Sequence, residues 1–329
     1  MMPEPVLSTT FLGMEFQSPV LLASGILGNN AGLLKDSIEK GAGGIITKTL
    51  TLTTRPCYPG PNIIEPYPGV VLNAMGLPNP GYKDFVKDLE SHDLLPEKEG
   101  APPIIPSIYG TSPEELSELA QVIESKGFKA VEINISCPHS KTGRMPKLVS
   151  QDPDATFQYV SHVKDCVGIP VITKLSPNVT DIGEIAIAAL RAGTDALSLI
   201  NTVQALEVDP VLQQPVLGNV FGGQSGSSIR PIAQRKLADV MISQTEAKDK
   251  GEIDVMVPVI GIGGISTGLD AARFVSLGAA LVAVGTAAID DKQILQNINN
   301  QLLEYMVEMG YKCLDDFRGM ALARIMELI

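Results

Sequence analysis

Eight short apolar segments, each followed by a stretch with helical periodicity, constrain the fold of this chain most strongly. The segments are Val20–Ala23, Gly44–Thr49, Pro103–Ile108, Ala130–Ile135, Pro170–Leu175, Ala196–Ile200, Val257–Gly261 and Leu281–Gly285. Most are apolar on both faces, which is typical of parallel strands covered on both sides. Repeated strand–helix units without a break in composition predict an α/β fold, a (β/α)8 TIM barrel, as a single domain over residues 1–329.

The connecting segments agree with a barrel. Ser112-Pro113-Glu114-Glu115 is a strong helix start, with Ser as the N-cap and Pro at the first helical position. Further helices are expected at 180–192, 229–247, 268–276 and 291–309. A doubly wound sheet is the alternative, but the turn after its first strand should read GxGxxG, and Ser24–Asn29 does not. The Pro- and Gly-rich insertion Thr51–Gly100 is expected to cover the C-terminal mouth of the barrel.

Composition excludes several classes of function. The net charge of −12 disfavours nucleic-acid and anionic-membrane surfaces, which are held largely by Lys and Arg. The N-terminus lacks the basic and apolar regions of a signal peptide, and the longest apolar run, about 278–289, is too short to span a bilayer. The four cysteines form no CxxC pair, which argues against a metal site or iron–sulfur cluster in this chain. We expect a cytoplasmic protein.

Polar and glycine residues gather where the predicted strands end, which in such barrels is where the chemistry lies. Lys48 and Lys174 both end strands, and a buried ammonium is costly unless an anion meets it. Glycine turns at Gly261–Gly264 and Gly285-Thr286 follow the last two strands, the usual phosphate site of these barrels. Together they predict a nucleotide-like cofactor such as FMN. Gly222–Gly226 either closes over the same group or is a plain flexible loop.

Cys137 lies just after the fourth predicted strand, in Asn134-Ile135-Ser136-Cys137-Pro138-His139. A lone cysteine there is more often structural than chemical. Its position opposite two lysines and a phosphate site instead favours a thiol that removes a proton from a substrate while hydride passes to flavin N5. Lys174 near flavin N1 would stabilise the negative charge of the reduced ring.

Several motifs resemble those of the class 1 dihydroorotate dehydrogenases, in one order from about Thr10 to Gly319. They are Thr47-Lys48-Thr49, the run Leu72–Gly81, Asn134–Pro138, Lys174–Asn178, Asn201-Thr202 and the two terminal glycine turns. The resemblance implies FMN-dependent oxidation of (S)-dihydroorotate to orotate in de novo pyrimidine (UMP) biosynthesis, with Cys137 and Lys48 as catalytic residues.

The resemblance also implies which residues bind each ligand. FMN would be bound by Ala23, Ser24, Lys48, Thr49, Asn134, Lys174, Gly226, Gly263, Gly264, Gly285 and Thr286. Dihydroorotate would be bound by Lys48, Asn73, Met75, Gly76, Leu77, Asn134, Asn201 and Thr202. Backbone N–H groups of Met75–Leu77 suit the substrate carboxylate, and the asparagines suit the ring amides.

Within the family, Asn201-Thr202 and Lys174–Asp181 resemble class 1B. Such enzymes pass electrons to NAD through a partner subunit carrying FAD and a 2Fe–2S cluster, so this chain would be the catalytic subunit, as a homodimer. The electron acceptor stays open, since NAD through a partner, fumarate and a quinone all fit the motifs.

Two departures keep alternatives open. His139 stands where class 1 dihydroorotate dehydrogenases usually have an asparagine that contacts the substrate. A histidine at this position resembles dihydropyrimidine dehydrogenases, so reduction of uracil or thymine is the main alternative function. Arg230 replaces a common lysine near the phosphate. Ser140–Val149 is either a lid that excludes water or a basic surface loop. A tRNA-modifying dihydrouridine synthase is disfavoured by the net charge, and a non-enzymatic flavin-binding protein leaves Cys137 and the two lysines unexplained.

Overall fold

A closed barrel of parallel strands forms the centre of the molecule in the computed structural model, which describes residues 5–25, 27–95, 102–136, 149–291 and 293–329. The hydrogen-bonded order is β7-β4-β3-β17-β16-β11-β10-β9-β8. The bounds are β3 Val20–Leu22, β4 Gly44–Ile46, β7 Ile104–Ile105, β8 Ser107–Ile108, β9 Val131–Asn134, β10 Val171–Lys174, β11 Ala196–Leu199, β16 Val259–Ile262 and β17 Leu281–Val284. All eight predicted strands are confirmed, and so is the TIM-barrel fold.

The third predicted strand is divided into two pieces, and this division closes the barrel. β7 pairs with β4, whereas β8 pairs with β9 on the other side. Only Pro106 separates the pieces. Proline has no N–H to donate to a strand partner, so a break at this position costs little pairing. When β7 and β8 are counted as one strand, the barrel has eight strands.

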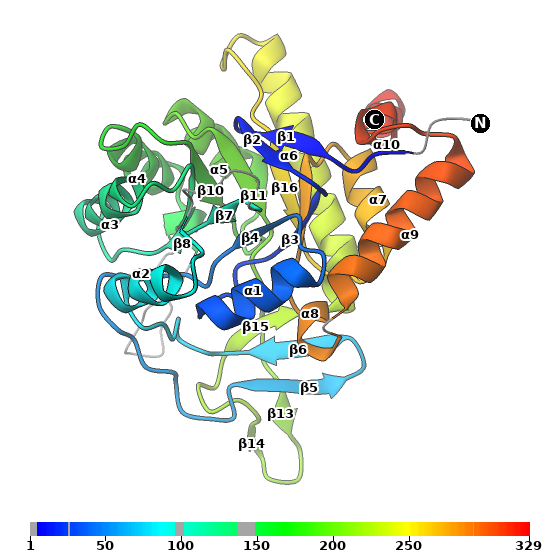
Figure 1. Cartoon of the computed structure of the whole chain (residues 1–329). Helices are drawn as coiled ribbons and strands as arrows, with labels where there is room; N and C mark the ends of the chain where they lie inside the picture. Colours follow the sequence, from blue (N-terminus) through cyan, green and yellow to red (C-terminus); the bar gives the residue numbers. More distant parts are fainter. Residues whose placement is uncertain (1–4, 26, 96–101, 137–148, 292) are drawn as a thin grey trace.

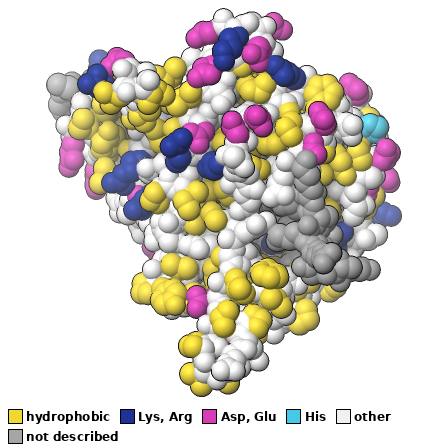
Figure 2. All heavy atoms as spheres, turned by 180° about the vertical axis from the view of Figure 1, so that it is seen from behind, with side chains coloured by type: hydrophobic (Ala, Val, Ile, Leu, Met, Phe, Trp, Pro, Cys, Tyr) yellow, Lys and Arg dark blue, Asp and Glu magenta, His cyan; other side chains and the backbone are white. Residues whose placement is uncertain are grey.

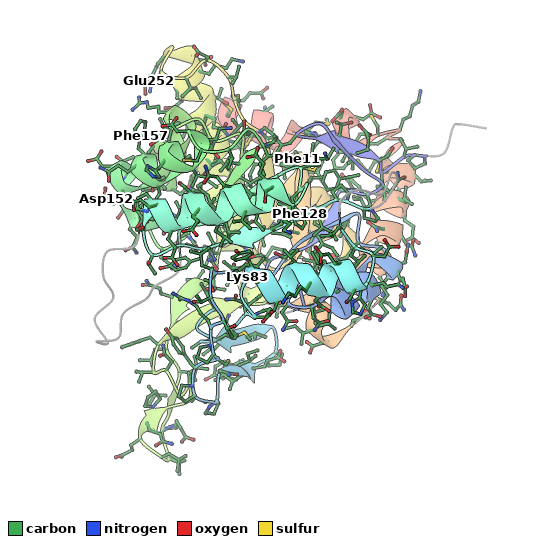
Figure 3. The ribbon with its side chains drawn as sticks, turned by 60° about the vertical axis from the view of Figure 1, so that its left-hand side comes forward. Phe11, Lys83, Phe128, Asp152, Phe157 and Glu252 are labelled. Atoms are coloured by element: carbon green, nitrogen blue, oxygen red, sulfur yellow. The ribbon has the colours of Figure 1, made fainter. Side chains whose placement is uncertain are left out.

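Helices surround the barrel (Figure 1). Their bounds are α1 Ala31–Glu39, α2 Tyr82–Ser91, α3 Pro113–Ser125, α4 Pro153–Lys164, α5 Ile182–Arg191, α6 Arg230–Asp249, α7 Gly268–Ser276, α8 Ala287–Asp290, α9 Ile294–Met309 and α10 Met320–Leu328. The five expected helices are confirmed as α3, α5, α6, α7 and α9. Ser112 caps α3 by accepting from Glu115 N, and Asp152 caps α4 in the same manner (Figure 3).

Two separate apolar clusters form the core of the barrel and its helices. The larger one lies between the barrel and its helices and includes Leu34, Phe85, Phe128 and Phe274. The smaller one fills the barrel interior with alternate strand residues such as Leu21, Ile46, Ile172 and Ile260. This alternation matters for the site, because it means that residues 132, 134 and 174 also point inward.

A hairpin of β1 (Thr9–Phe11) and β2 (Met14–Phe16) closes one end of the barrel. Phe11 and Phe16 belong to the interior cluster and meet edge to face, with ring centroids 6.2 Å apart. Figure 1 shows this hairpin at the end opposite to β5 and β6. The bottom of the barrel is therefore filled by side chains, and its other end is the mouth.

The mouth is covered by a second, four-stranded sheet that the sequence did not predict. Its order is β12-β15-β6-β5, all antiparallel, with bounds β5 Ile63–Tyr67, β6 Val70–Asn73, β12 Val203–Ala205 and β15 Gly222–Ser225. The insertion supplies β5 and β6, which confirms that it covers the mouth. Reading Gly222–Gly226 as a plain flexible loop is wrong, because residues 222–225 are the strand β15.

Glycine makes this second sheet possible. A Cβ on Gly222 would stand 2.5 Å from the carbonyl oxygen of Asn73, and one on Gly223 would stand 2.0 Å from Thr202 Oγ1. The strands therefore approach more closely than side chains would permit. Beyond the sheet, β13 (Val208–Asp209) and β14 (Gln214–Pro215) form a hairpin that projects from the molecule, with Val211 and Leu212 exposed (Figure 2).

None of the helices in the described part of the chain is both long and apolar enough to cross a membrane.

Candidate functional site

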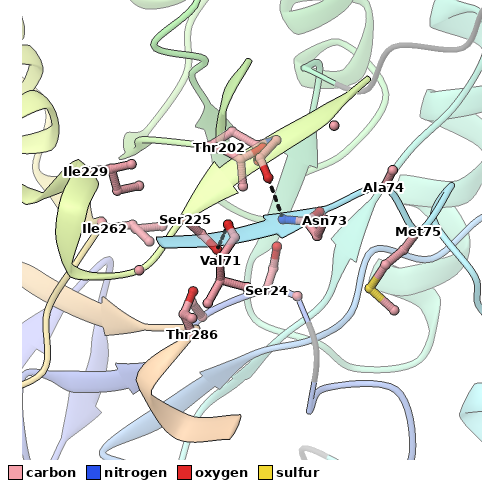
Figure 4. Close-up of a pocket in the computed structure, with 18 of the residues that line it drawn as sticks. Ser24, Val71, Asn73, Ala74, Met75, Thr202, Ser225, Ile229, Ile262 and Thr286 are labelled. Carbon is pink, nitrogen blue, oxygen red and sulfur yellow. Dashed lines mark hydrogen bonds between the residues drawn. The ribbon is translucent and has the colours of Figure 1, made fainter. Parts of the chain in front are cut away.

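A cavity of about 1160 Å³ opens between the carboxyl ends of the barrel strands and the second sheet (Figure 4). All the predicted cofactor and substrate residues line it: Ala23, Ser24, Lys48, Thr49, Asn73, Met75, Gly76, Leu77, Asn134, Lys174, Asn201, Thr202, Gly226, Gly263, Gly264, Gly285 and Thr286. Cys137, His139 and the expected lid up to residue 148 lie outside the described residues. The structure thus brings together groups that are far apart in the sequence.

The two terminal glycine turns lie side by side because β16 and β17 are neighbours in the barrel. Gly263 and Gly264 have φ of +131° and +72°, values that favour glycine. A Cβ on Gly264 would stand 2.7 Å from Arg230 Cβ, so the turn packs directly against the start of α6. A Cβ on Gly285 would have more room, since its nearest neighbour would be Ala23 Cβ at 3.7 Å. Both turns line the cavity, and their glycines present only backbone to it.

Asp270 and Thr267 form hydrogen bonds with the backbone at the N-terminus of α7. Asp270 Oδ2 accepts from the backbone N–H groups of Ser266 and Thr267, and Thr267 Oγ1 accepts from Asp270 N. This capping box already satisfies the groups that would otherwise face an anion. A phosphate here would depend on the turns themselves.

Asp270 also fixes Arg230, the arginine that stands where a lysine is common. Its Oδ1 lies 2.8 Å from Arg230 Nη1 and 2.7 Å from Arg273 Nη1. The Asp270 side chain is almost fully buried, at 2% exposed. One carboxylate therefore joins the start of α6 to the start of α7 beneath the glycine turns.

Lys48 and Lys174 are both buried at the cavity floor, as the strand-end argument predicted. Lys174 Nζ donates to Ser24 Oγ at 3.1 Å. On its other side, Glu132 Oε1 lies 3.9 Å away in the barrel interior. Lys48 follows β4, and its backbone N–H donates to Gly28 O at 2.8 Å. Two buried lysines thus line a single cavity, an arrangement that suits a negatively charged ligand.

A chain of hydrogen bonds orients the asparagines of the site. Asn134 Nδ2 donates to Thr49 Oγ1 at 3.1 Å, while its Oδ1 accepts from Ser136 Oγ at 2.8 Å. Ser136 Oγ in turn accepts from Asn201 Nδ2. Asn73 reaches across from β6 and donates to Gly223 O at 3.3 Å (Figure 4). These bonds fix which amide atom of Asn134 and Asn201 occupies each position.

The segment Ala74–Pro78 is held in shape by Asn79. Asn79 Nδ2 donates to Leu77 O at 2.9 Å, and its Oδ1 accepts from the N–H groups of Thr51 and Gly81. Leu77 has φ of +56°, which a leucine rarely adopts, and Gly76 packs on the ring of Tyr58. The backbone of residues 75–77 is therefore presented to the cavity in a fixed shape.

Sequence reasoning missed the groups that support the site, among them Glu132, Ser136, Asn79 and Asp270. A signal existed for Glu132, because it precedes Asn134 by two residues in a strand and must share its inward face. Ser136 and Asn79 stood inside quoted motifs, but each also bonds to a distant residue, Asn201 at 65 positions and Thr51 at 28, and no local pattern shows these contacts.

Known proteins that are similar to this chain support this interpretation of the site. The family model for dihydroorotate dehydrogenase matches residues 6–306. The chain is 38% identical to the catalytic subunit of dihydroorotate dehydrogenase B (NAD(+)) from Pyrococcus horikoshii, over 98% of this chain and 99% of that protein. It is 39% identical to the protein of the same name from Methanothermobacter thermautotrophicus, over 96% and 98%. The ligand-free dihydroorotate dehydrogenase of Eimeria tenella shares the fold, with a TM-score of 0.78 at 21% identity, over 97% of this chain and 94% of that one.

The chain belongs to the dihydroorotate dehydrogenase family. Its relatives place it on the class 1B side of that family, as the motifs predicted, and make it a flavin-dependent oxidoreductase. They do not favour the alternative in which it reduces uracil or thymine. The departure at His139 thus occurs within a dihydroorotate dehydrogenase framework.

Proposed function

We propose that this chain oxidises (S)-dihydroorotate to orotate with FMN as its cofactor, in de novo pyrimidine biosynthesis, and that residues 1–329 form one domain. One observation carries the proposal: a single cavity joins a pair of glycine turns, two buried lysines and a set of oriented asparagines. The turns suit a phosphate, the lysines suit negative charge, and the asparagines suit a ring with amide groups.

The residues present fit FMN. Gly263, Gly264, Gly285 and Thr286 leave backbone exposed at one end of the cavity, where a phosphate would accept from N–H groups. Gly226 lies beside them with φ of +91°. Lys174, held by Ser24, lies in the floor of the same cavity and would meet the negative charge of the isoalloxazine ring. Ala23, Thr49 and Asn134 complete the proposed cofactor contacts.

Dihydroorotate would bind between this floor and the second sheet. Lys48 and the backbone N–H groups of residues 75–77 would receive its carboxylate. Asn73, Asn134, Asn201 and Thr202 would pair with the amide groups of the ring, since each side-chain amide offers both a donor and an acceptor. The fixed shape of the 74–78 segment means that little ordering is needed when the substrate binds.

Bound FMN would supply the electron acceptor, taking at N5 the hydride that leaves C6 of the substrate. Cys137, as the thiolate, would take the proton from C5, so that a C5–C6 double bond forms and the thiol is left neutral. Lys48 would hold the carboxylate so that C5 is presented to Cys137. The order of residues in the chain supports this role, because Cys137 follows Ser136, which lines the cavity.

We further propose that the chain is the catalytic subunit of a class 1B enzyme in the cytoplasm. Its relatives are named as catalytic subunits of an NAD(+) enzyme, and those names imply a second subunit. That subunit would carry FAD and a 2Fe–2S cluster, and the chain itself would form a homodimer. Sedimentation of the chain alone and with the candidate partner tests both assemblies.

An anaerobic experiment tests the proposed reaction. Dihydroorotate is mixed with the FMN-loaded protein, and bleaching of the flavin absorbance is followed before NAD or other acceptors are added. Dihydroorotate should bleach the flavin, and uracil in the reverse assay should not be reduced. Cys137→Ser should retain FMN but bleach slower by orders of magnitude. Unchanged bleaching in that variant would overturn the role of Cys137, and no bleaching in the wild type would overturn the function.

A further inference from the structure

Glu132 is a buried carboxylate that the proposed reaction does not use. It lies in β9 with an exposed fraction of 0%, between the inward positions Ala130 and Asn134. Around it the barrel interior is filled by apolar side chains such as Ile172 and Ala196. Placing an ionised carboxylate in such surroundings costs several kcal/mol unless other groups compensate. The buried charge of Glu132 therefore requires a group that stabilises it.

Hydrogen bonding compensates only one of its two oxygens. Oε2 accepts from Ser198 Oγ at 2.8 Å. Oε1 is buried and has no hydrogen-bond partner among the described residues. Among the described residues, Oε1 forms an ion pair with Lys174 Nζ, at 3.9 Å. The negative charge of Glu132 therefore depends on the ammonium of Lys174.

Lys174 lies between this carboxylate and the cavity. In the sheet register Lys174 pairs with Asn134 and Ser198, whereas Glu132 pairs with Ile172, two residues further from the mouth. On the cavity side, Nζ donates to Ser24 Oγ. The positive charge of Lys174 is thus already partly neutralised by Glu132 before an anion enters the cavity.

We propose that Glu132 is a positioning residue that lowers the redox potential of bound FMN by partly neutralising Lys174. The proposal rests on the proposed function, since it needs FMN in this cavity. Reduction adds negative charge beside Lys174, and that charge is stabilised less when Glu132 shares the same ammonium. With Gln at 132, Lys174 would lose the carboxylate that partly neutralises it, and FMN would be easier to reduce.

Midpoint potentials of the FMN-loaded proteins test this proposal, measured anaerobically against reference dyes. Glu132→Gln should shift the potential to a more positive value, with an equilibrium constant for reduction at least tenfold larger, or about 30 mV for two electrons. Lys174→Gln should shift it to a more negative value. Glu184→Gln, on the exposed face of α5, is the matched control and should leave it unchanged.

The double variant separates an electrostatic role from a merely structural one. Because the proposed effect of Glu132 acts through the ammonium of Lys174, Glu132→Gln should change little in the Lys174→Gln background. An unchanged or more negative potential in Glu132→Gln, or an equal shift in both backgrounds, would overturn the proposal.

Ser198→Ala keeps the test available if Glu132→Gln does not fold. It removes the hydrogen bond to Oε2 without changing either charged residue, so the carboxylate is held less firmly beside the ammonium of Lys174. The potential should move in the same positive direction by a smaller amount, and no movement contradicts the role of Glu132. If the wild type fails to bind FMN, this proposal and the proposed function both fail; if it is reduced by dihydroorotate but no variant shifts, only the Glu132 proposal does.

Discussion

Ser136 accepts at Oγ a hydrogen bond from Nδ2 of Asn201, a residue 65 positions further along the chain. The same hydroxyl donates its hydrogen to Asn134 Oδ1 at 2.8 Å. One hydroxyl thus helps to orient two side-chain amides, together with the bond from Asn134 Nδ2 to Thr49 Oγ1 and the bond from Thr202 N to Asn201 Oδ1. Ser136 therefore helps to determine which amide atoms of Asn134 and Asn201 face a ligand, whether or not the ligand contacts Ser136 itself.

Replacing Ser136 by Ala should weaken orotate binding while FMN stays bound. Loss of these two bonds at about 1 kcal/mol each predicts an increase in the orotate Kd of roughly five- to thirtyfold. Titration of the flavin absorbance with orotate measures it. Ser125→Ala, which removes an exposed hydroxyl on α3, is the control. Equal affinities in the two variants would show that Ser136 has no orienting role.

Adding a methyl group at Gly264 should release FMN. Alanine at a positive φ costs about 1–2 kcal/mol by itself, and here the new Cβ also meets Arg230. Gly251→Ala is a matched control, since Gly251 has φ of +70° but nothing within 4 Å of the new atom. FMN content after gel filtration should fall sharply for Gly264→Ala alone. Similar FMN content in the two variants would contradict a phosphate site at this turn.

Asp270→Ala should destabilise the protein through the junction of α6 and α7. It removes the capping box of α7, worth about 0.5–2 kcal/mol, and it leaves Arg230 and Arg273 without their shared carboxylate. Urea unfolding measures the loss. Asp239→Ala breaks a pair with Arg235, whose side chain is 79% exposed, and should unfold like the wild type. A small effect at Asp270 would mean that water replaces both contacts.

The rate of flavin reduction should rise with pH in the wild type. A thiol of ordinary pKa, about 8.5, is mostly protonated at neutral pH, so the reactive thiolate increases about tenfold per unit below that value. Stopped-flow reduction between pH 6 and 9 measures the rise. Cys57→Ser is the control, because Cys57 also lines the cavity and its loss should leave the profile unchanged. A flat profile with chemistry rate-limiting argues against Cys137 as the base.

The barrel was predictable because its strands carry their own signal. Val20–Leu22 or Leu281–Val284 are buried on both faces, so each reads as a strand without its neighbours. The sheet over the mouth lacks such a signal. β5 is exposed at alternate residues and contains Pro66, while β15 begins with two glycines, and both form only because β6 lies between them. The contacts of Glu132 with Lys174 and of Asp270 with Arg230 likewise join residues that are distant in the sequence.

The hairpin that fills the bottom of the barrel has a consequence for the order of events. With Phe11 and Phe16 packed into the interior, that end of the barrel is closed, so ligands of the cavity would enter and leave through the mouth. In the proposed arrangement FMN lies deeper than dihydroorotate, so it would bind before the substrate and leave only after it. Bound substrate or product would therefore slow the loss of the cofactor.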